Sequence, residues 1–398
     1  AKGNPVIFTN GDNDTFPLWY NQETEGVRTD ARVCNLSYLQ TDWYIDQMRR
    51  PAYDSPSLPI SWTRLQYVTG TREGIPVQPD ALQQVIDYYK DSPEDLKQML
   101  GDNPYELKNI IRHWVLNDNP DLQIFPTDSI VVTVDKEAVK RSGMMIAADS
   151  IPDVMHISLK GKRAVYKSEM MMLEMISQAN WERPLYMSTT VGPDNYGHLG
   201  DNFVQEGLAC RITPFDTKQS GRTIDSERMY NNMMNKFKYG GLKENPDIYL
   251  DETVIRMCYT HRRLFNQLAQ QLLKEGQKDK ALKVLQRAEE EIPGSIVPHE
   301  AFYGHSLELA DAWLALGHKA EAEKLLNAVG QNAKEYIEWY LSLNTQRLLQ
   351  SSRECLMQIY ILNDIAKTWE PIDKKKAETY RMEVNNYASR CHQRGMSL

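Results

Sequence analysis

The chain has 398 residues, more than one ordinary hydrophobic core accommodates, so two or three domains are expected. Hydrophobic residues make up 41% and charged residues 25% of the chain, a composition that excludes an intrinsically disordered protein. The formal net charge is -8 and the sequence has no dense stripe of Lys and Arg, so nucleic acid is not an expected partner.

Short apolar runs bounded by turn residues predict strands throughout the first half of the chain. These runs are residues 6–9, 32–36, 130–134, 154–159, 185–190 and 207–212. Helical patterns fall between several of them, at residues 15–25, 42–48 and 167–179. Strands that alternate with helices favour a three-layer, Rossmann-like α/β domain whose sheet is at least partly parallel.

A segment at about 51–120 interrupts this alternation. It opens with Pro51, Pro56 and Pro59 and then carries helical patterns, so we expect an insertion or lid. Strand signals end after about Asp216, and nearly everything from Asp251 onward is helical in pattern. The sequence therefore predicts an α/β domain over residues 1–248 and an all-α domain over residues 249–398.

The helical half carries the large, small and proline positions of a tetratricopeptide repeat. One well-formed repeat consists of Phe265, Leu268, Ala269, Leu272, Ala281, Leu285, Ala288 and Pro293. In a second unit, Ala322 follows the equivalent Ala281 by 41 residues instead of about 34, which predicts a longer connection. Further helices at 333–349, 352–369 and 374–392 would complete a short solenoid.

Polar residues come directly after the first predicted strand, in the string TNGDNDT of residues 9–15. The second predicted strand also ends in a polar run that leads into a helix. Ligands of open α/β sheets bind at the carboxyl ends of strands, where helix N-termini offer free N–H groups. Candidate ligand-binding residues at these two strand ends are Asn10, Asp12, Asn13, Asp14, Thr15, Thr41, Asp42 and Tyr44.

Two interpretations of Asp12 and Asp14 stay open. Their carboxylates could hold Mg²⁺, Mn²⁺ or Ca²⁺ against a phosphate, and a divalent cation is the one cofactor that the sequence suggests. Alternatively, these side chains satisfy backbone groups of the loop, with Thr15 as the N-cap of the following helix.

A second polar concentration, at residues 188–203, also follows a predicted strand. Its candidate residues for the same cleft are Thr189, Thr190, Asp194 and His198. His198 would serve as an acid or base there, or it is an exposed loop residue. His156, inside a predicted strand, is expected to be a buried core histidine. The sequence contains no Ser-His-Asp set, phosphate-binding loop or His-Glu-x-x-His motif.

Five cysteines are widely separated along the chain and include no Cys-x-x-Cys pair. This spacing predicts neither a disulfide framework nor a structural zinc site. It leaves the redox compartment open, because an exported protein need not use disulfides.

Four stretches resemble a known family. They are VIFTNGDNDTFPLWYNQETEGVRTDARVCNLSYLQTDWYIDQM, RPLYMSTTVGPDNYGHLGDNFVQEGLACRITP, YNNMMNKFKYGG and IYLDETVIRMCYTHR. They resemble the soluble C-terminal region of large bacterial multi-pass membrane proteins, a domain-of-unknown-function family related to transmembrane protein O-mannosyltransferases.

The resemblance implies that the chain is part of a longer protein with an N-terminal membrane domain of the kind that uses polyprenyl-phosphate sugars. It also implies a location on the periplasmic side of the inner membrane. It carries no catalytic residue onto this sequence, because the essential acidic residue of such enzymes lies between membrane helices.

These observations predict a non-catalytic periplasmic accessory module of a membrane-embedded glycosyltransferase. The expected partners are an acceptor protein, a glycan or the transmembrane part of the parent protein. The alternative makes the α/β domain itself a metal-dependent enzyme that processes a sugar or a phosphate with Asp12 and Asp14. Under the first hypothesis the parent is the glycosyltransferase and this region alone is not an enzyme.

Overall fold

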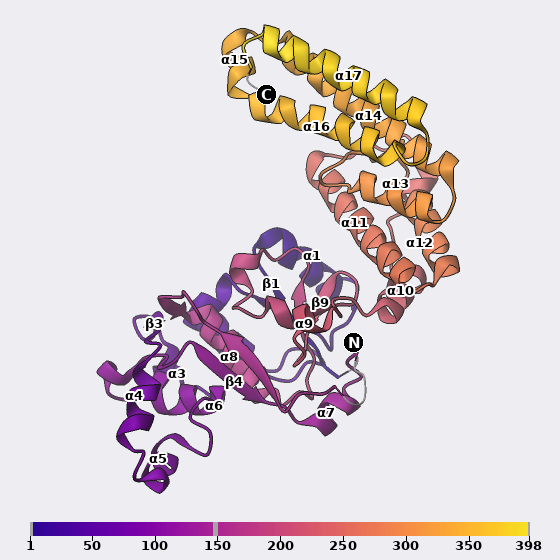
Figure 1. Cartoon of the computed structure of the whole chain (residues 1–398). Helices are drawn as coiled ribbons and strands as arrows, with labels where there is room; N and C mark the ends of the chain where they lie inside the picture. The colour runs from indigo at the N-terminus through magenta and orange to yellow at the C-terminus, as the bar shows by residue number, and fades with distance from the viewer. Residues whose placement is uncertain (1–2, 146–149, 397–398) are drawn as a thin grey trace. The chain divides into compact units, whose positions relative to one another are not determined.

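The computed structural model describes residues 3–145 and 150–396 of the chain. It divides into two compact units, Ala1–Asp225 and Ser226–Leu398 (Figure 1). This division lies before the expected boundary at 248, because helix α10 (Ser226–Asn235) packs on the helices that follow it. Lys280 pairs with Glu227 of α10 at 2.6 Å, which ties that helix to the second unit.

The first unit is built on a five-stranded mixed sheet with the strand order β2-β1-β7-β9-β8. Strand β1 (Val6–Thr9) pairs in parallel with both β2 (Arg32–Asn35) and β7 (Leu185–Ser188). Strand β9 (Ala209–Ile212) is antiparallel to β7, and β8 (Phe203–Gln205) is antiparallel to β9. The expected α/β class with a partly parallel sheet, followed by an all-α region, is confirmed.

Among the residues that the structure describes, four strands lie outside this sheet. The predicted strands at 130–134 and 154–159 pair with each other as β4 (Ser129–Thr133) and β5 (Val154–Ser158), in antiparallel register. Strands β3 (Gly74–Pro76) and β6 (Ala164–Tyr166) form a second antiparallel pair that the sequence did not predict, because three-residue runs carry too little periodicity.

Helices α1 (Asp12–Glu23) and α2 (Asp42–Met48) follow β1 and β2 closely, and α8 (Lys167–Gln178) precedes β7. Helix α1 begins three residues earlier than expected. Gly11 is its N-cap residue, with a φ of 77° and a ψ of 178°, a conformation essentially restricted to glycine. Thr15 therefore lies inside the helix, and the expectation that it caps α1 is wrong.

The core of the first unit joins the sheet to these helices. Phe8 of β1 is fully buried with Ile45 of α2 and with the methionines Met171 and Met175 of α8. Two further short helices of this unit are α7 (Lys136–Arg141) and α9 (Thr217–Ser220).

The segment at about 51–120 carries short helices and a small apolar cluster of its own. Leu82, Leu100, Trp114 and Ile124 form that cluster. A π-helix at Ile111–Val115 continues the last helix of the segment. The four α-helices are α3 (Arg64–Tyr67), α4 (Ala81–Tyr88), α5 (Pro93–Leu100) and α6 (Leu107–Ile110).

The second unit consists of helical pairs. Figure 1 shows α16 and α17 side by side with α14 at the C-terminal end of the chain. The apolar positions of the predicted repeat, including Phe265, Leu268 and Ala281, are fully buried. Its long helices are α11 (Glu252–Lys274), α12 (Lys278–Glu291), α13 (Ser306–Ala315), α14 (Lys319–Ser342), α16 (Ser352–Trp369) and α17 (Lys374–Gln393).

The helix expected at 333–349 is wrong in its boundaries. Helix α14 continues to Ser342, and a new helix, α15 (Thr345–Gln350), follows. The Asn344 side chain accepts a hydrogen bond from the Arg347 amide at 3.0 Å and so caps α15.

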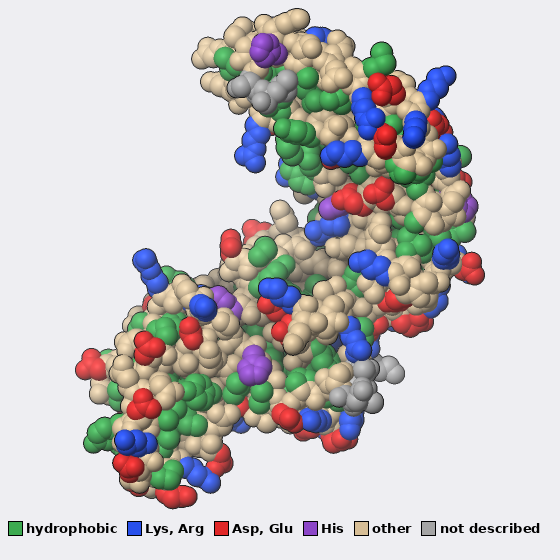
Figure 2. Space-filling model, in the orientation of Figure 1, with side chains coloured by type: hydrophobic (Ala, Val, Ile, Leu, Met, Phe, Trp, Pro, Cys, Tyr) green, Lys and Arg blue, Asp and Glu red, His purple; other side chains and the backbone are tan. Residues whose placement is uncertain are grey.

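Within residues 3–145 and 150–396, no helix is both long and apolar enough to cross a membrane. Acidic and basic side chains are interspersed on the face shown in Figure 2.

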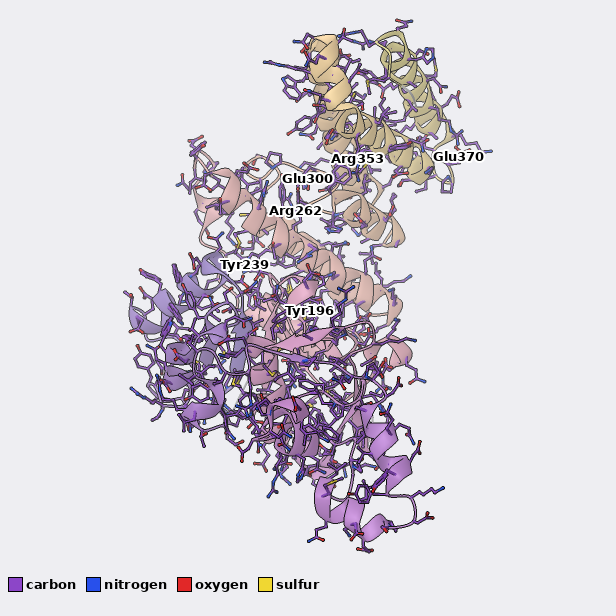
Figure 3. All side chains as sticks on the ribbon, turned by 90° about the vertical axis from the view of Figure 1, so that its left-hand side faces the viewer. Tyr196, Tyr239, Arg262, Glu300, Arg353 and Glu370 are labelled. Carbon is purple, nitrogen blue, oxygen red and sulfur yellow. The ribbon has the colours of Figure 1, made fainter. Side chains whose placement is uncertain are left out.

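Arg262 of α11, labelled in Figure 3, holds the long connection between the two repeats through hydrogen bonds. Its side chain is 1% exposed. The guanidinium donates hydrogen bonds to the carbonyl oxygens of Ile292 at 3.0 Å, Val297 at 2.8 Å and Pro298 at 3.0 Å. Burial lowers the pKa of Arg262. The five-donor planar group suits this task because it bonds several carbonyls at once.

We expect Arg262→Leu to lower the free energy of unfolding by about 3 kcal/mol, because the buried carbonyls of Ile292 and Val297 lose a charged donor. The matched control is Arg256→Leu on the same helix, whose exposed pair with Glu252 should contribute less than about 0.5 kcal/mol. Urea denaturation followed by circular dichroism measures both. Equal losses in the two variants would show that Arg262 does not hold the connection.

Candidate functional site

Parallel pairing brings the polar ends of β1, β2 and β7 to one edge of the sheet. The Ser37 hydroxyl, after β2, donates to the Asn10 side-chain oxygen at 2.6 Å. The Asp14 carboxylate accepts a hydrogen bond from the Asn10 amide at 3.3 Å and another from the Thr190 hydroxyl, after β7. Asn10, Asp14 and Thr190 are thus brought together, and hydrogen bonds join the three strand ends directly.

The Thr15 side chain stabilises this edge of the sheet through hydrogen bonds. Its buried hydroxyl donates to the Gly11 carbonyl at 2.8 Å and lies 2.8 Å from both the Thr9 hydroxyl and the Asn35 side-chain nitrogen. Because all these hydrogen bonds are internal, Thr15 is a supporting residue of the edge. Asn35, the last residue of β2, belongs to the same network and is absent from the candidates chosen by sequence.

Asp12 and Asn13 are exposed at the start of α1. The Tyr38 hydroxyl donates to the Asp12 carboxylate at 3.3 Å. Burial, followed by the Asp12 charge, raises the pKa of Tyr38. Among the described residues, no group of three or more His, Cys, Asp and Glu side chains could hold a metal ion. A divalent cation at Asp12 and Asp14 stays a prediction.

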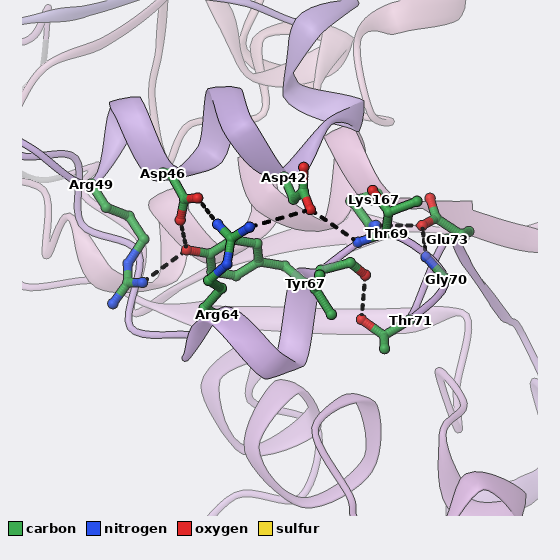
Figure 4. Close-up of polar contacts among 11 residues, drawn as sticks. Asp42, Asp46, Arg49, Arg64, Tyr67, Thr69, Gly70, Thr71, Glu73 and Lys167 are labelled. Atoms are coloured by element: carbon green, nitrogen blue, oxygen red, sulfur yellow. Dashed lines mark hydrogen bonds and ion pairs between the residues drawn. The ribbon is translucent and has the colours of Figure 1, made fainter.

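Asp42 contacts the segment at about 51–120, through Arg64 and Thr69 (Figure 4). Its carboxylate accepts from the Thr69 amide at 3.4 Å and lies 3.7 Å from the Arg64 guanidinium, which also pairs with Asp46. The Thr69 amide is the largest cause that lowers the pKa of Asp42. Asp42 therefore fastens α2 to the segment, and the structure does not bring it together with Asp12 and Asp14.

Tyr44 and Thr41 also have structural roles, because their hydroxyl groups bond to backbone groups of the protein. Tyr44 is buried, which raises its pKa, and its hydroxyl accepts from the Asn35 amide at 2.9 Å and donates to the Val33 carbonyl at 3.4 Å. Strand β2 is an edge strand, so Tyr44 satisfies backbone groups that no neighbouring strand reaches. The Thr41 hydroxyl donates to the Tyr38 carbonyl at 2.7 Å.

The residues expected after β7 separate into different places. The Thr189 hydroxyl donates to the Leu208 carbonyl at 3.2 Å, and Asp194 is exposed in a 3₁₀ turn. His198 lines a cavity of about 810 Å³ together with Asp201 and His156, and neither Asp12 nor Asp14 is among the residues that line this cavity. His156 is exposed on β5, so the expectation that it is a core histidine is wrong.

A row of aromatic side chains lies beside the polar edge, and we call Phe16, Trp19, Tyr38 and Trp43 the aromatic row. Successive ring centroids are 5.6, 6.3 and 5.9 Å apart. Phe16 is 46% and Trp43 is 49% exposed. The bond between Tyr38 and Asp12 places the row next to an exposed carboxylate.

Sequence reasoning missed the aromatic row, although part of its signal was available. Phe16 and Trp19 are three residues apart, so a helix places them on one face. Tyr38 and Trp43 join that face only through the pairing of β1 with β2, which no local pattern reveals.

We expect Asp14→Ala to lower the free energy of unfolding by about 1–2 kcal/mol, because the Asn10 amide and the Thr190 hydroxyl lose a charged acceptor. Asp12→Ala, which removes one exposed contact, should cost less than about 0.5 kcal/mol. Chemical denaturation compares the two variants, and equal losses of unfolding free energy would contradict the network.

Melting curves in Mg²⁺, Mn²⁺ and Ca²⁺ test the predicted cation. If it binds, the cation must raise the melting temperature of the original chain but not that of Asp12→Ala.

The lowered pKa of Asp42 predicts a pH dependence. A carboxyl group with a lowered folded pKa stabilises the fold fully above its unfolded pKa of about 4, and this stabilisation is lost as the pH falls through the folded value. When the pH is lowered from about 6 to about 3, the melting temperature of Asp42→Asn should therefore fall by less than that of the original chain. The control is Asp91→Asn, at an exposed position of the same segment, whose melting temperature should fall with pH as much as that of the original chain. An equal fall in Asp42→Asn and Asp91→Asn would reject the role of Asp42.

Comparison with known proteins identifies one family. The family model described as TMEM260-associated domain 2 matches residues 1–232. No curated protein and no solved structure matches the chain. The match confirms the expected tie to a transmembrane protein family, while the bacterial origin and the relation to protein O-mannosyltransferases stay predictions. Since the matched region makes up more than half of the 398 residues, the chain belongs to the TMEM260-associated domain 2 family.

Proposed function

We propose that this chain is a non-catalytic accessory module of a membrane-embedded, protein O-mannosyltransferase-like glycosyltransferase, located on the periplasmic side of the inner membrane, and that it binds a glycan. Membership of a family tied to transmembrane proteins supports the link to a membrane-embedded parent. The four stretches that resemble the O-mannosyltransferase-related family support a glycosyltransferase as that parent. The aromatic row is the observation that carries the binding role.

Carbohydrates have two chemical sides that match this surface. A pyranose ring presents C–H groups on its faces and hydroxyl groups around its rim. Exposed aromatic faces, such as those of Phe16 and Trp43, attract the C–H faces, since aromatic rings combine apolar area with an electron-rich face. The Asp12 carboxylate and the Asn13 amide, both exposed beside the row, can accept hydrogen bonds from the hydroxyls.

The row is anchored to the core, which suits a binding surface. Trp19 and Tyr38 are partly buried and pack against the main hydrophobic core. Tyr44 lies beneath, with its ring centroid 5.7 Å from that of Tyr38 and at an interplanar angle of 67°. Rings that are already fixed lose little conformational entropy when a ligand binds.

The polar edge favours a supporting role for Asp14 over a catalytic one. Its two carboxylate oxygens accept hydrogen bonds from Asn10 and Thr190 within the protein. Both oxygens thereby help to hold the ends of β1 and β7 together, which is a structural task. Of the three partners expected from the sequence, the glycan fits this surface best.

We expect Phe16→Ala and Trp43→Ala each to weaken glycan binding about tenfold, since one stacked ring contributes about 1 kcal/mol or slightly more. Isothermal titration with a panel of mannose, glucose and N-acetylglucosamine oligosaccharides measures the affinity. Tyr88→Ala is the matched control, because Tyr88 is 80% exposed on α4 and lies outside the row. Far-ultraviolet circular dichroism checks that each variant is folded.

Two outcomes would reject the proposal. One is that no oligosaccharide binds, or that Tyr88→Ala weakens binding as much as the row variants do. The other is that the parent protein, carrying Phe16→Ala and Trp43→Ala together, transfers sugar to its acceptor at an unchanged rate. Binding of an unglycosylated acceptor polypeptide that depends on the row would assign the surface to a protein partner instead.

A further inference from the structure

Two buried thiols face each other in the second unit. The Sγ atoms of Cys355, in α16, and Cys391, in α17, are 3.9 Å apart. Both side chains are 0% exposed. Disulfide formation needs an S–S distance of about 2.05 Å, so a movement of less than about 2 Å would bring the two sulfur atoms to bonding distance.

The position of the pair in the helical hairpin gives a bond there a structural effect. Residues between Trp369 and Lys374 connect α16 to α17 at one end of the hairpin. Cys355 is near the start of α16 and Cys391 near the end of α17, so the thiols lie at the opposite, open end. A covalent bond at that end would close the hairpin on both sides.

The last turn of α17 is otherwise held by polar contacts to α14 and the residues after it. Arg390 pairs with Glu338 at 2.5 Å. Arg394 donates to the carbonyl oxygens of Leu341 and Leu343, the latter at 2.7 Å. These contacts hold the end of α17 on α14, while the packing of α17 on α16 brings Cys391 to Cys355.

We propose that Cys355 and Cys391 form an intramolecular disulfide when the chain folds in the presence of a disulfide oxidant. In the first step, the thiolate of one cysteine attacks the oxidant disulfide and forms a mixed disulfide, which releases one thiol of the oxidant. The second cysteine thiolate then displaces the remaining oxidant thiol. Two S–H bonds are lost, one S–S bond forms, and the oxidant takes up the two electrons and the two protons.

The surroundings of the pair indicate when this reaction takes place. Burial, together with the neighbouring Cys391 thiol, raises the pKa of Cys355 to about 12, and burial also raises the pKa of Cys391. Thiols with raised pKa values react slowly in the folded chain, because the thiolate is the nucleophile. The bond therefore forms during folding, and the same burial afterwards shields it from reductants.

A disulfide between these residues would stabilise the second unit. It would join positions 36 residues apart, which restricts the unfolded chain over that whole length. This inference does not depend on glycan binding, which concerns the first unit, so failure of one proposal leaves the other standing.

The test is refolding of the full chain from denaturant in buffer with oxidised and reduced glutathione, and in parallel with dithiothreitol. Alkylation under denaturing conditions and mass spectrometry then count free thiols and map the linked peptides. The expected result is three of the five cysteines alkylated after oxidative refolding, with Cys355 linked to Cys391. We also expect the oxidised chain to melt about 5–10 °C above the reduced chain.

Variants separate this bond from general effects of oxidation. Cys391→Ser should abolish the gain in melting temperature, whereas Cys258→Ser, at another buried cysteine of the same unit, should keep it. Five alkylated cysteines after oxidative refolding of the original chain would overturn the proposal. A disulfide that involves a different cysteine would also overturn it. Thiol counting and peptide mapping are both done on the original chain, so these two outcomes do not depend on whether the variants fold.

Discussion

Parallel pairing of β1 with β2 on one side and β7 on the other is the constraint on which the first unit depends. It makes three strands end at one edge of the sheet, although β7 follows β1 by about 180 residues in the sequence. Ser37 reaches Asn10, and Thr190 reaches Asp14, only because of this arrangement. The internal polar network then fixes the loop before α1, and with it the direction of that helix.

The aromatic row follows from the same pairing. Helix α1 leaves the end of β1 and presents Phe16 and Trp19, while Tyr38 and Trp43 come from the chain that follows β2. Two segments that leave neighbouring strands at the same edge of the sheet start close together and therefore pack side by side. The surface that we propose for a glycan is thus a consequence of sheet topology, and the exposed carboxylate of Asp12 beside it has the same origin.

Contacts between distant residues also organise the second unit, but through helices. The buried Arg262 replaces the tight turn of a regular repeat by holding three carbonyls of a longer connection. At the far end of the chain, the pairing of α16 with α17 aligns Cys355 with Cys391. The Arg262 contacts allow the first of these connections to be longer than in a regular repeat.

The sequence by itself determined the longer strands and helices, the α/β and all-α halves, and the apolar positions of the first repeat, because periodicity and turn chemistry are local. It also located polar residues at strand ends. Only the tertiary structure decided that Asp14 joins the edge while Asp42 turns to Arg64 and Thr69, since both follow strands and differ only in what packs against them. The same holds for Cys355 and Cys391, whose approach depends on helix register and leaves no trace in local spacing.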